Sequence, residues 1–373
     1  MTTAVDFVEL RVVRVPLRQP FANAVHVTTD KVAVLVTVGH EGIEGYGEGV
    51  MEPLPWFREE TVDGALTVLG EALVPDLLRH GCADPAALAD RWTFVRGNPM
   101  AKAALEMAVW DLRARQQGVP LWQALGGDGQ PVPVGAALGL ADGEEALIET
   151  VAQHVEQGYR RIKVKVRPGR EQDIVTAVRD AFPDVALSVD ANCAYTLADT
   201  TMLAALDRFG LDYIEQPLHW DDLIDHAVLA AQLDTPICLD ESLNSPERVT
   251  AALEVGACSV VNIKAGRLGG LAAVQRAAEA CRRVGVPMWC GGMLELGIGR
   301  AHNIHLATLA GFDLPGDTAS ASRTYTRDIV NEPLEATAGL MAVPPGPGIG
   351  VTVDRSFLDA VTVTRHRHTG ASR

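Results

Sequence analysis

The sequence predicts an α/β fold in which a β/α barrel follows a smaller α+β domain. From about residue 131, short β-rich runs alternate strictly with amphipathic helical patterns, whereas residues 1–125 lack this alternation. Strict alternation of strand and helix is typical of right-handed βαβ units and a parallel sheet. A chain of 373 residues, 47% of them hydrophobic, is long enough for both parts.

Residues 1–125 carry the signals of a small antiparallel sheet followed by helices. β-branched runs separated by glycine-rich turns predict the strands, and apolar residues at helical spacing predict the helices. The expected strands are Val5–Val15, Val32–Val38 and Tyr46–Val50, and the expected helices are Val62–Leu78 and Ala101–Gln117.

Seven β-rich runs follow, with helical patterns such as Glu144–Gln157 between them. Eight such strands, or seven with a degenerate end, would close a barrel. An open doubly wound sheet is the alternative, but its glycine-rich phosphate loop does not fit Gly139–Gly143 after the first run. The runs are Val132–Leu138, Arg161–Val166, Ala186–Asp190, Tyr213–Glu215, Ile237–Asp240, Ser259–Lys264 and Pro287–Cys290.

Composition disfavours several classes of partner. A net charge of −16 opposes binding to nucleic acid or anionic lipid, and the one basic run, Arg365–His368, is interpreted as a frayed terminus. The six cysteines form no C-x-x-C pair, which predicts free thiols in a reducing cytoplasm. No secretory core and no apolar run of ~18 residues occurs, so we expect a cytoplasmic protein without a membrane span.

An ionisable residue stands at the end of each of five successive predicted strands. The spacing from one to the next is 25, 25, 25 and 24 residues, about the length of one βα unit. A single acid after a strand is often only the cap of the next helix, but five groups in register indicate an active site at the carboxyl end of the barrel. The residues are Lys165 with Lys163 two positions before it, Asp190, Glu215, Asp240 and Lys264.

The residue types indicate the chemistry. Three carboxylates from neighbouring strands suit Mg²⁺, with Mn²⁺ able to replace it. Lys163 and Lys165 point to the same side of one strand, so each cation makes the other harder to protonate, which favours a lysine base. Lys264 would arrive from across the barrel. The α-proton of a metal-held carboxylate substrate could then be removed from either face, and the metal would stabilise the enediolate.

Several motifs together resemble one known family. The Lys-x-Lys pair and the three acid motifs look like the muconate lactonizing subgroup of the enolase superfamily. The later motifs are similar to the o-succinylbenzoate synthase / N-acylamino acid racemase family. The motifs are Asp190-Ala-Asn192, Glu215-Gln-Pro217, Asp240-Glu-Ser242, Ile263–Gly270, Cys290–Arg300 and Leu314–Thr318.

The resemblance implies a modified (β/α)7β TIM-like barrel with an N-terminal α+β capping domain. The expected parts are the cap at 1–125, the barrel at 126–325, and a C-terminal segment at 326–373 that returns to the cap. It also implies a homo-oligomer and the following roles. Asp190, Glu215 and Asp240 bind the metal; Lys165 and Lys264 are the acid/base pair; Lys163 holds the substrate carboxylate; and Asn192, Glu241, Arg267, Met293 and Leu294 surround the substrate or support the site.

The expected activity is dehydration to o-succinylbenzoate in menaquinone synthesis, with N-acylamino acid racemisation as a candidate second activity, to which Arg267 points. A dedicated racemase, a muconate cycloisomerase and a dipeptide epimerase are the alternatives. A non-catalytic carboxylate-binding barrel would be expected to lack one of the three lysines. The sequence departs from the family at Leu296 and in the capping loops Phe21–Thr29 and Pro53–Arg58, so the substrate side chain stays open. His302 and His305 are interpreted as packed histidines, not as ligands.

Overall fold

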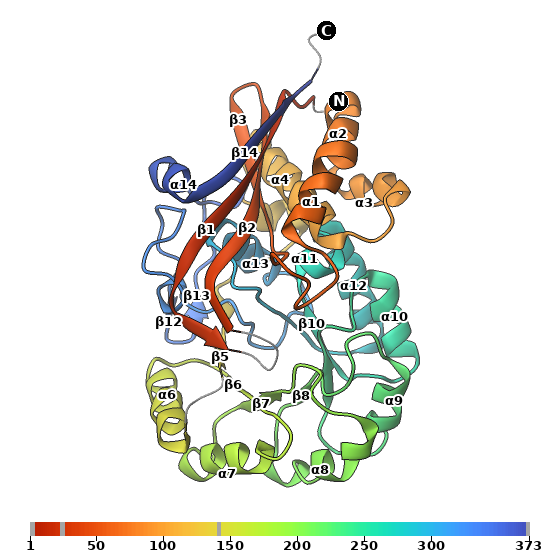
Figure 1. Cartoon of the computed structure of the whole chain (residues 1–373), viewed down its shortest axis with the longest axis vertical. Helices are drawn as coiled ribbons and strands as arrows, with labels where there is room; N and C mark the ends of the chain where they lie inside the picture. Colours follow the sequence, from red (N-terminus) through yellow and green to blue (C-terminus); the bar gives the residue numbers. More distant parts are fainter. Residues whose placement is uncertain (1–3, 23–26, 140–142, 371–373) are drawn as a thin grey trace.

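The computed structural model describes residues 4–22, 27–139 and 143–370. The cap lies at one end of the long axis and the barrel at the other (Figure 1). The cap sheet is antiparallel, in the order β14-β1-β2-β3. Strands β1, β2 and β3 confirm the three predicted strands. The strands of the sheet are β1 (Phe7–Ala22), β2 (Val27–His40), β3 (Ile43–Gly49) and β14 (Thr362–Thr369).

Helices cover one face of the cap sheet. The predicted helix at 62–78 is present as two α-helices joined by a π-helical segment, and the predicted helix at 101–117 is present as α4. α4 lies close to β3 because Gly47 has no side chain: a Cβ there would lie 2.0 Å from the Ala104 carbonyl. The cap helices are α1 (Val62–Val68), η1 (Leu69–Leu73), α2 (Val74–His80), η2 (Pro85–Ala87), α3 (Leu88–Arg91), η3 (Trp92–Phe94), α4 (Pro99–Gln117) and α5 (Leu121–Leu125).

The barrel contains a parallel sheet of seven strands, β5 to β11 in sequence order. All seven predicted runs contribute a strand, so the parallel-sheet prediction is confirmed. The strands are β5 (Ala136–Leu138), β6 (Ile162–Lys165), β7 (Leu187–Asp190), β8 (Ile214–Glu215), β9 (Ile237–Leu239), β10 (Val260–Ile263) and β11 (Met288–Cys290). The helices and short 3-10 turns are α6 (Glu144–Glu156), α7 (Glu171–Ala181), η4 (Leu197–Asp199), α8 (Thr200–Ala204), η5 (Asp207–Phe209), α9 (Ile224–Ala230), α10 (Pro246–Glu254), α11 (Ala265–Leu268), α12 (Leu271–Val284), α13 (Gly297–Leu306) and η6 (Ala321–Arg323).

The first predicted barrel strand, Val132–Leu138, is divided in two. Its first two residues, β4 (Val132–Pro133), pair with a separate hairpin, and only β5 joins the barrel sheet. The break lies at Val134 and Gly135, directly after Pro133, which has no N–H to donate to a sheet. The hairpin strands are β12 (Ala336–Thr337) and β13 (Leu340–Met341).

The eighth position of the barrel is occupied by the segment 314–317, which is not a regular strand. On one side, Asp317 donates its N–H to Cys290 of β11 at 2.9 Å. On the other side, Gly135 donates to the Gly316 carbonyl at 2.7 Å, next to β5. This segment therefore links the two ends of the parallel sheet, as expected for seven strands with a degenerate end.

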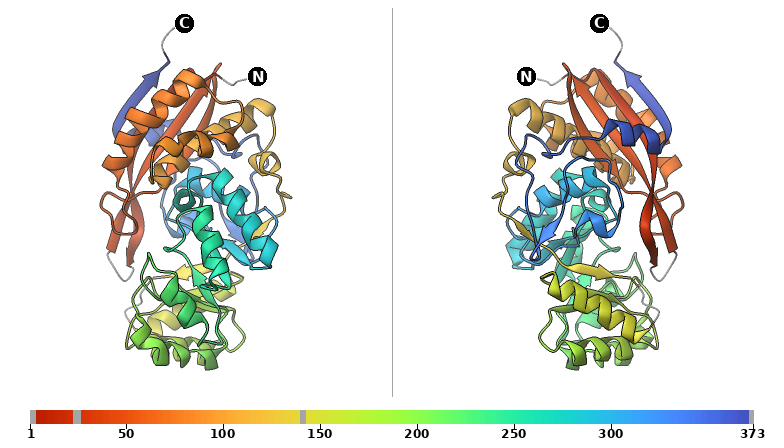
Figure 2. Two further views of the ribbon diagram at one scale, coloured as in Figure 1. Left: turned by 90° about the vertical axis from the view of Figure 1, so that its right-hand side faces the viewer. Right: turned by 90° about the vertical axis from the view of Figure 1, so that its left-hand side faces the viewer.

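The C-terminal segment returns to the cap. After α14 (Arg355–Val361), strand β14 pairs antiparallel with β1 and lies beside it in both views of Figure 2. The interpretation of Arg365–His368 as a frayed terminus is therefore wrong. Arg365 bonds Glu9 at 2.8 Å, and the Arg367 guanidinium lies 3.8 Å from the centroid of the Phe7 ring. These contacts hold the basic residues on the sheet, although the strand itself stays largely exposed.

Two buried acids of the cap bind the ends of barrel helices. Glu48 of β3 accepts the backbone N–H groups of Leu296 and Gly299 at the start of α13, at 2.9 and 2.8 Å. Glu106 of α4 accepts two N–H groups at the start of α12, at 2.9 and 3.0 Å. Such N–H groups have no partner within their own helix, so each acid satisfies donors of the barrel from the cap.

The remaining sequence expectations concern packing. All six cysteines are free. His302 and His305 are fully buried as expected: His302 Nε2 lies 2.8 Å from the Tyr46 carbonyl, and His305 Nδ1 accepts the Trp122 N–H at 3.1 Å. Across 4–22, 27–139 and 143–370, no helix is both long and apolar enough to cross a membrane.

Candidate active site

The predicted catalytic and metal residues meet at the carboxyl ends of the barrel strands. Lys165, Asp190 and Glu215 are the last residues of β6, β7 and β8, and they lie side by side in the sheet register. Asp240 and Lys264 directly follow β9 and β10. The parallel order of these strands brings all five groups to one end of the barrel, where barrel enzymes bind substrates.

Each of the three carboxylates is paired with a lysine. Lys165 Nζ lies 2.9 Å from Asp190 Oδ2, Lys163 Nζ lies 2.7 Å from Glu215 Oε2, and Lys264 Nζ lies 2.7 Å from Asp240 Oδ2. The sequence predicted that the three acids and the lysines share one end of the barrel, but not which lysine pairs with which acid. Buried carboxylates are costly without a counter-charge, so the lysines stabilise them in this arrangement. Lys165 and Lys163 hold the pKa of Asp190 below its usual value although burial opposes this shift.

The donor set fits a hard divalent cation. Within the described ranges, no three His, Cys, Asp or Glu side chains already converge as they do around a bound ion. However, Glu241 Oε2 and Asn262 Oδ1 are buried beside the paired acids without a hydrogen-bond partner. Burial and the nearby carboxylate of Asp190 raise the pKa of Glu241 to about 7. Carboxylate and amide oxygens such as these two are the type of ligand that Mg²⁺ prefers.

The loops after β7 and β8 hold the acids in place with strained backbone. Asn192 and Gln216 have positive φ angles of 41° and 38°, which cost free energy for residues other than glycine. Asn192 joins Lys165, through its side-chain oxygen, to Glu241, through its amide. Gln216, which the sequence analysis did not single out, accepts the backbone N–H of Asp240 at 3.0 Å.

Arg267 lies beneath the site and is fully buried. Its guanidinium pairs with Asp240 and donates to the Asn262 carbonyl at 2.5 Å. It therefore supports Asp240 from behind rather than reaching the space in front of the lysines. Lys264 reaches that space past Gly291, where a Cβ would lie 2.8 Å from its Cε atom.

Lys163 has partners that the sequence analysis missed. Its ammonium bonds Asp317 at 2.6 Å as well as Glu215, and it lies 4.6 Å from the centroid of the Trp289 ring. Arg161 pairs with the other oxygen of the same Asp317. Burial opposes the shift, but the carboxylates of Asp317 and Glu215 raise the pKa of Lys163 well above its usual value.

The capping loops cover the two outer lysines with aromatic rings. Lys264 Nζ lies 4.7 Å from the Phe57 ring centroid, and Lys165 Nζ lies 5.8 Å from that of Phe21. Arg58 fixes the first loop by donating to the Glu241 carbonyl at 3.0 Å. Residues 23–26 of the other loop lie outside the described residues.

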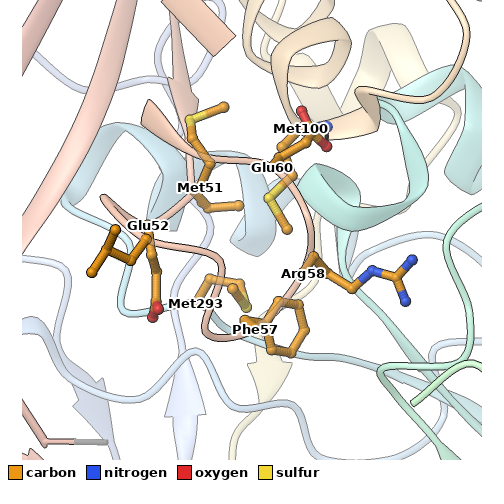
Figure 3. A pocket seen from close by; sticks show the side chains of 9 residues that line it. Met51, Glu52, Phe57, Arg58, Glu60, Met100 and Met293 are labelled. Carbon is orange, nitrogen blue, oxygen red and sulfur yellow. Dashed lines mark hydrogen bonds between the residues drawn. The ribbon is translucent and has the colours of Figure 1, made fainter. Parts of the chain in front are cut away.

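A small apolar pocket lies beside the Phe57 loop (Figure 3). Residues of the cap and Met293 from the barrel line it. Lys264 Nζ lies 3.6 Å from Met293 Sδ, which places this pocket next to the lysine. Leu294, partly buried with φ at 54°, accepts the Tyr325 hydroxyl through its carbonyl. The lining residues are Val50, Met51, Glu52, Leu54, Phe57, Arg58, Glu60, Met100 and Met293.

Family models match most of the chain. The model "Mandelate racemase / muconate lactonizing enzyme, N-terminal domain" matches residues 7–126, and the model "Enolase C-terminal domain-like" matches residues 146–357. The chain therefore belongs to the enolase superfamily, and it is an enzyme. Members of this superfamily generally use a divalent metal.

Similar proteins narrow the comparison. An N-succinylamino acid racemase of Thermus thermophilus is 50% identical, over 96% of this chain and 97% of the relative. An o-succinylbenzoate synthase of Geobacillus kaustophilus is 48% identical, over 97% of each chain. The solved structure of an enolase-superfamily member from Listeria innocua has a TM-score of 0.96 and 38% identity, over 99% of this chain and 100% of that one.

Proposed function

We propose that this enzyme removes the proton α to a carboxylate and dehydrates 2-succinyl-6-hydroxy-2,4-cyclohexadiene-1-carboxylate to o-succinylbenzoate. The observation that supports this best is the placement of two lysines, Lys264 buried and Lys165 nearly so, on either side of the acids. Lys165 ends β6 and Lys264 follows β10, with β7, β8 and β9 and their carboxylates between them. An acidic carbon held in front of these carboxylates would have an ammonium or amine group on each face.

Each lysine has a distinct part in the proposed reaction. Lys165 accepts the α-proton and then protonates the departing hydroxyl, so that water leaves and the aromatic product forms. Lys264 places its charge beside the developing enediolate on the other face, and Lys163 holds the carboxylate. Mg²⁺ held by Asp190, Glu215 and Asp240 would supply further positive charge to the enediolate. Both outer lysines must leave their carboxylate partners before they act.

Racemisation of N-succinylamino acids is the second candidate. A racemase needs an acid/base group on each face of the substrate, and the two-lysine arrangement provides it. The relative from Thermus thermophilus carries that name. The proposal includes a homo-oligomeric assembly, a cytoplasmic location and the division of the chain at 125 and 325.

The test is kcat/KM for the cyclohexadiene substrate with Mg²⁺, after treatment with a chelator, and after Mg²⁺ is restored. Turnover that disappears with the chelator and returns with Mg²⁺ would support the synthase. Racemisation of N-succinylamino acids, followed by polarimetry on the same enzyme preparation, would test the second candidate. Absence of turnover with both substrates would refute the proposal.

A further inference from the structure

Asp317 lies in a network of buried charges below the outer lysines. Its two carboxylate oxygens bind different cations: Oδ1 pairs with Arg161 and Oδ2 with Lys163. The Trp289 ring lies under both cations, 4.8 Å from the Arg161 guanidinium carbon and 4.6 Å from Lys163 Nζ. Arg161 also donates to the Tyr213 hydroxyl. The network therefore connects the start and middle of β6 to β11 and to the segment that closes the barrel.

The buried ion pairs of Asp317 are not explained by a contribution to the stability of the fold. Removing two cations and an anion from water costs about as much as their attraction returns, so buried ion pairs contribute little net stability. The position of Asp317 is nevertheless closely fixed, because its N–H bonds Cys290 at 2.9 Å and its carbonyl accepts the Ala319 N–H at 2.9 Å. The carboxylate is thus held on a rigid part of the barrel.

The contact with Asp317 fixes how the Lys163 ammonium is oriented. An ammonium group has three N–H donors. Glu215 and Asp317 take two of them, at 2.7 and 2.6 Å. With two directions fixed and the Trp289 ring on one side, the direction of the third N–H is also fixed. Lys163 without Asp317 would have one carboxylate partner and could turn about it.

We infer that Asp317 is a positioning residue for substrate binding: together with Arg161 it holds the Lys163 ammonium so that its third N–H points to the substrate carboxylate. This inference rests on the proposed function, in which Lys163 binds that carboxylate. Asp317 itself does not touch the substrate. Lys163 binds the carboxylate in the ground state and in the transition state alike, so Asp317 acts mainly on KM.

The experiment measures kcat and KM for the wild type, Asp317→Asn and Asp317→Glu with saturating Mg²⁺. Asp317→Asn keeps the shape of the side chain and removes its charge. Its KM should rise about tenfold or more, the usual effect of weakening a hydrogen bond to a charged group, while kcat changes less. Asp317→Glu keeps the charge and should recover part of the loss.

Asp111→Asn is the matched control, with thermal unfolding measured for every variant. Asp111, like Asp317, pairs with an arginine inside the protein, Arg115 at 3.0 Å, but it is fully buried and lies in the cap helix α4. It should lose stability with KM unchanged. An equal rise of KM in both Asn variants, or wild-type KM in Asp317→Asn, would overturn this inference but leave the proposed function standing. A wild type without turnover would overturn the proposed function and this inference with it.

Arg161→Lys keeps the inference testable if Asp317→Asn does not fold. A lysine retains the charge but cannot reproduce the planar guanidinium contacts with Asp317 and Tyr213. KM should then rise in the same direction as in Asp317→Asn. An Arg161→Lys variant with unchanged KM would contradict the role of Arg161 in holding Asp317.

Discussion

Replacing Lys165 by methionine should abolish turnover and also destabilise the metal-free enzyme. Loss of a general base usually lowers the rate by about 10²–10⁴-fold. The ammonium lies 2.9 Å from Asp190 Oδ2. At an effective dielectric constant of about 20, this attraction is about 6 kcal/mol before desolvation is counted. Leaving one partner of a buried pair uncompensated costs about 3–5 kcal/mol. The metal-free variant should therefore unfold at a clearly lower temperature than the wild type.

Mg²⁺ should reverse this loss. In the wild type the ion must displace Lys165 from Asp190, whereas in Lys165→Met that carboxylate is free to bind it. Thermal unfolding with and without Mg²⁺ should show a larger Mg²⁺-dependent rise for the variant, and α-proton exchange in D₂O measures the lost base. Lys102→Met is the control, since Lys102 lies in the cap and donates to the Val95 carbonyl there, away from the acids of the site. Turnover within tenfold of wild type, or unchanged metal-free stability, would refute the reasoning.

Three further outcomes are expected. Lys264→Met should lose α-proton exchange for one enantiomer of an N-succinylamino acid and keep it for the other, measured by NMR in D₂O; equal loss for both would contradict the two-face arrangement. Glu215→Gln should weaken Mg²⁺ binding in a calorimetric titration, and an unchanged titration would place the metal elsewhere. Burial raises the pKa of Glu106 to about 7, from 4.5. The folded chain then binds more protons than the unfolded one, so this contribution to stability, on the order of 3 kcal/mol, is present below pH 4.5 and is lost as pH rises through 7. Urea unfolding from pH 5 to 8 should show a shallower decline in Glu106→Gln; an identical decline would exclude Glu106 as its source.

The sequence predicted the strand ends well because strand and helix alternate at a nearly constant interval. Lys165, Asp190 and Glu215 stand at the ends of adjacent strands, and a parallel sheet places such residues together whatever the helices between them contain. The pairing of each acid with its own lysine could not be predicted, because it depends on side-chain directions across the barrel. The same is true of Arg267, which proved to lie behind Asp240.

Two parts of the fold could not be located residue by residue from the sequence, for different physical reasons. The segment around Asp317 contains proline and glycine and is not β-rich, so its place in the barrel follows only from the closure of the ring. The strand β14 is rich in arginine and histidine, which is unusual for a paired strand. It pairs with β1, and its Arg365 bonds Glu9, a residue more than 350 positions away in the chain; local patterns contain no information about such partners.

The acids Glu48 and Glu106 limit how this enzyme can be recombined with its relatives. Each belongs to the cap but completes the hydrogen bonding of a barrel helix, at α13 and α12. A chimera that joins this barrel to a foreign cap would need an acid at both positions, and a barrel produced alone would expose both helix ends to water. In any exchange of caps, the strand and the helix that carry these two acids must therefore be transferred together with the barrel they serve.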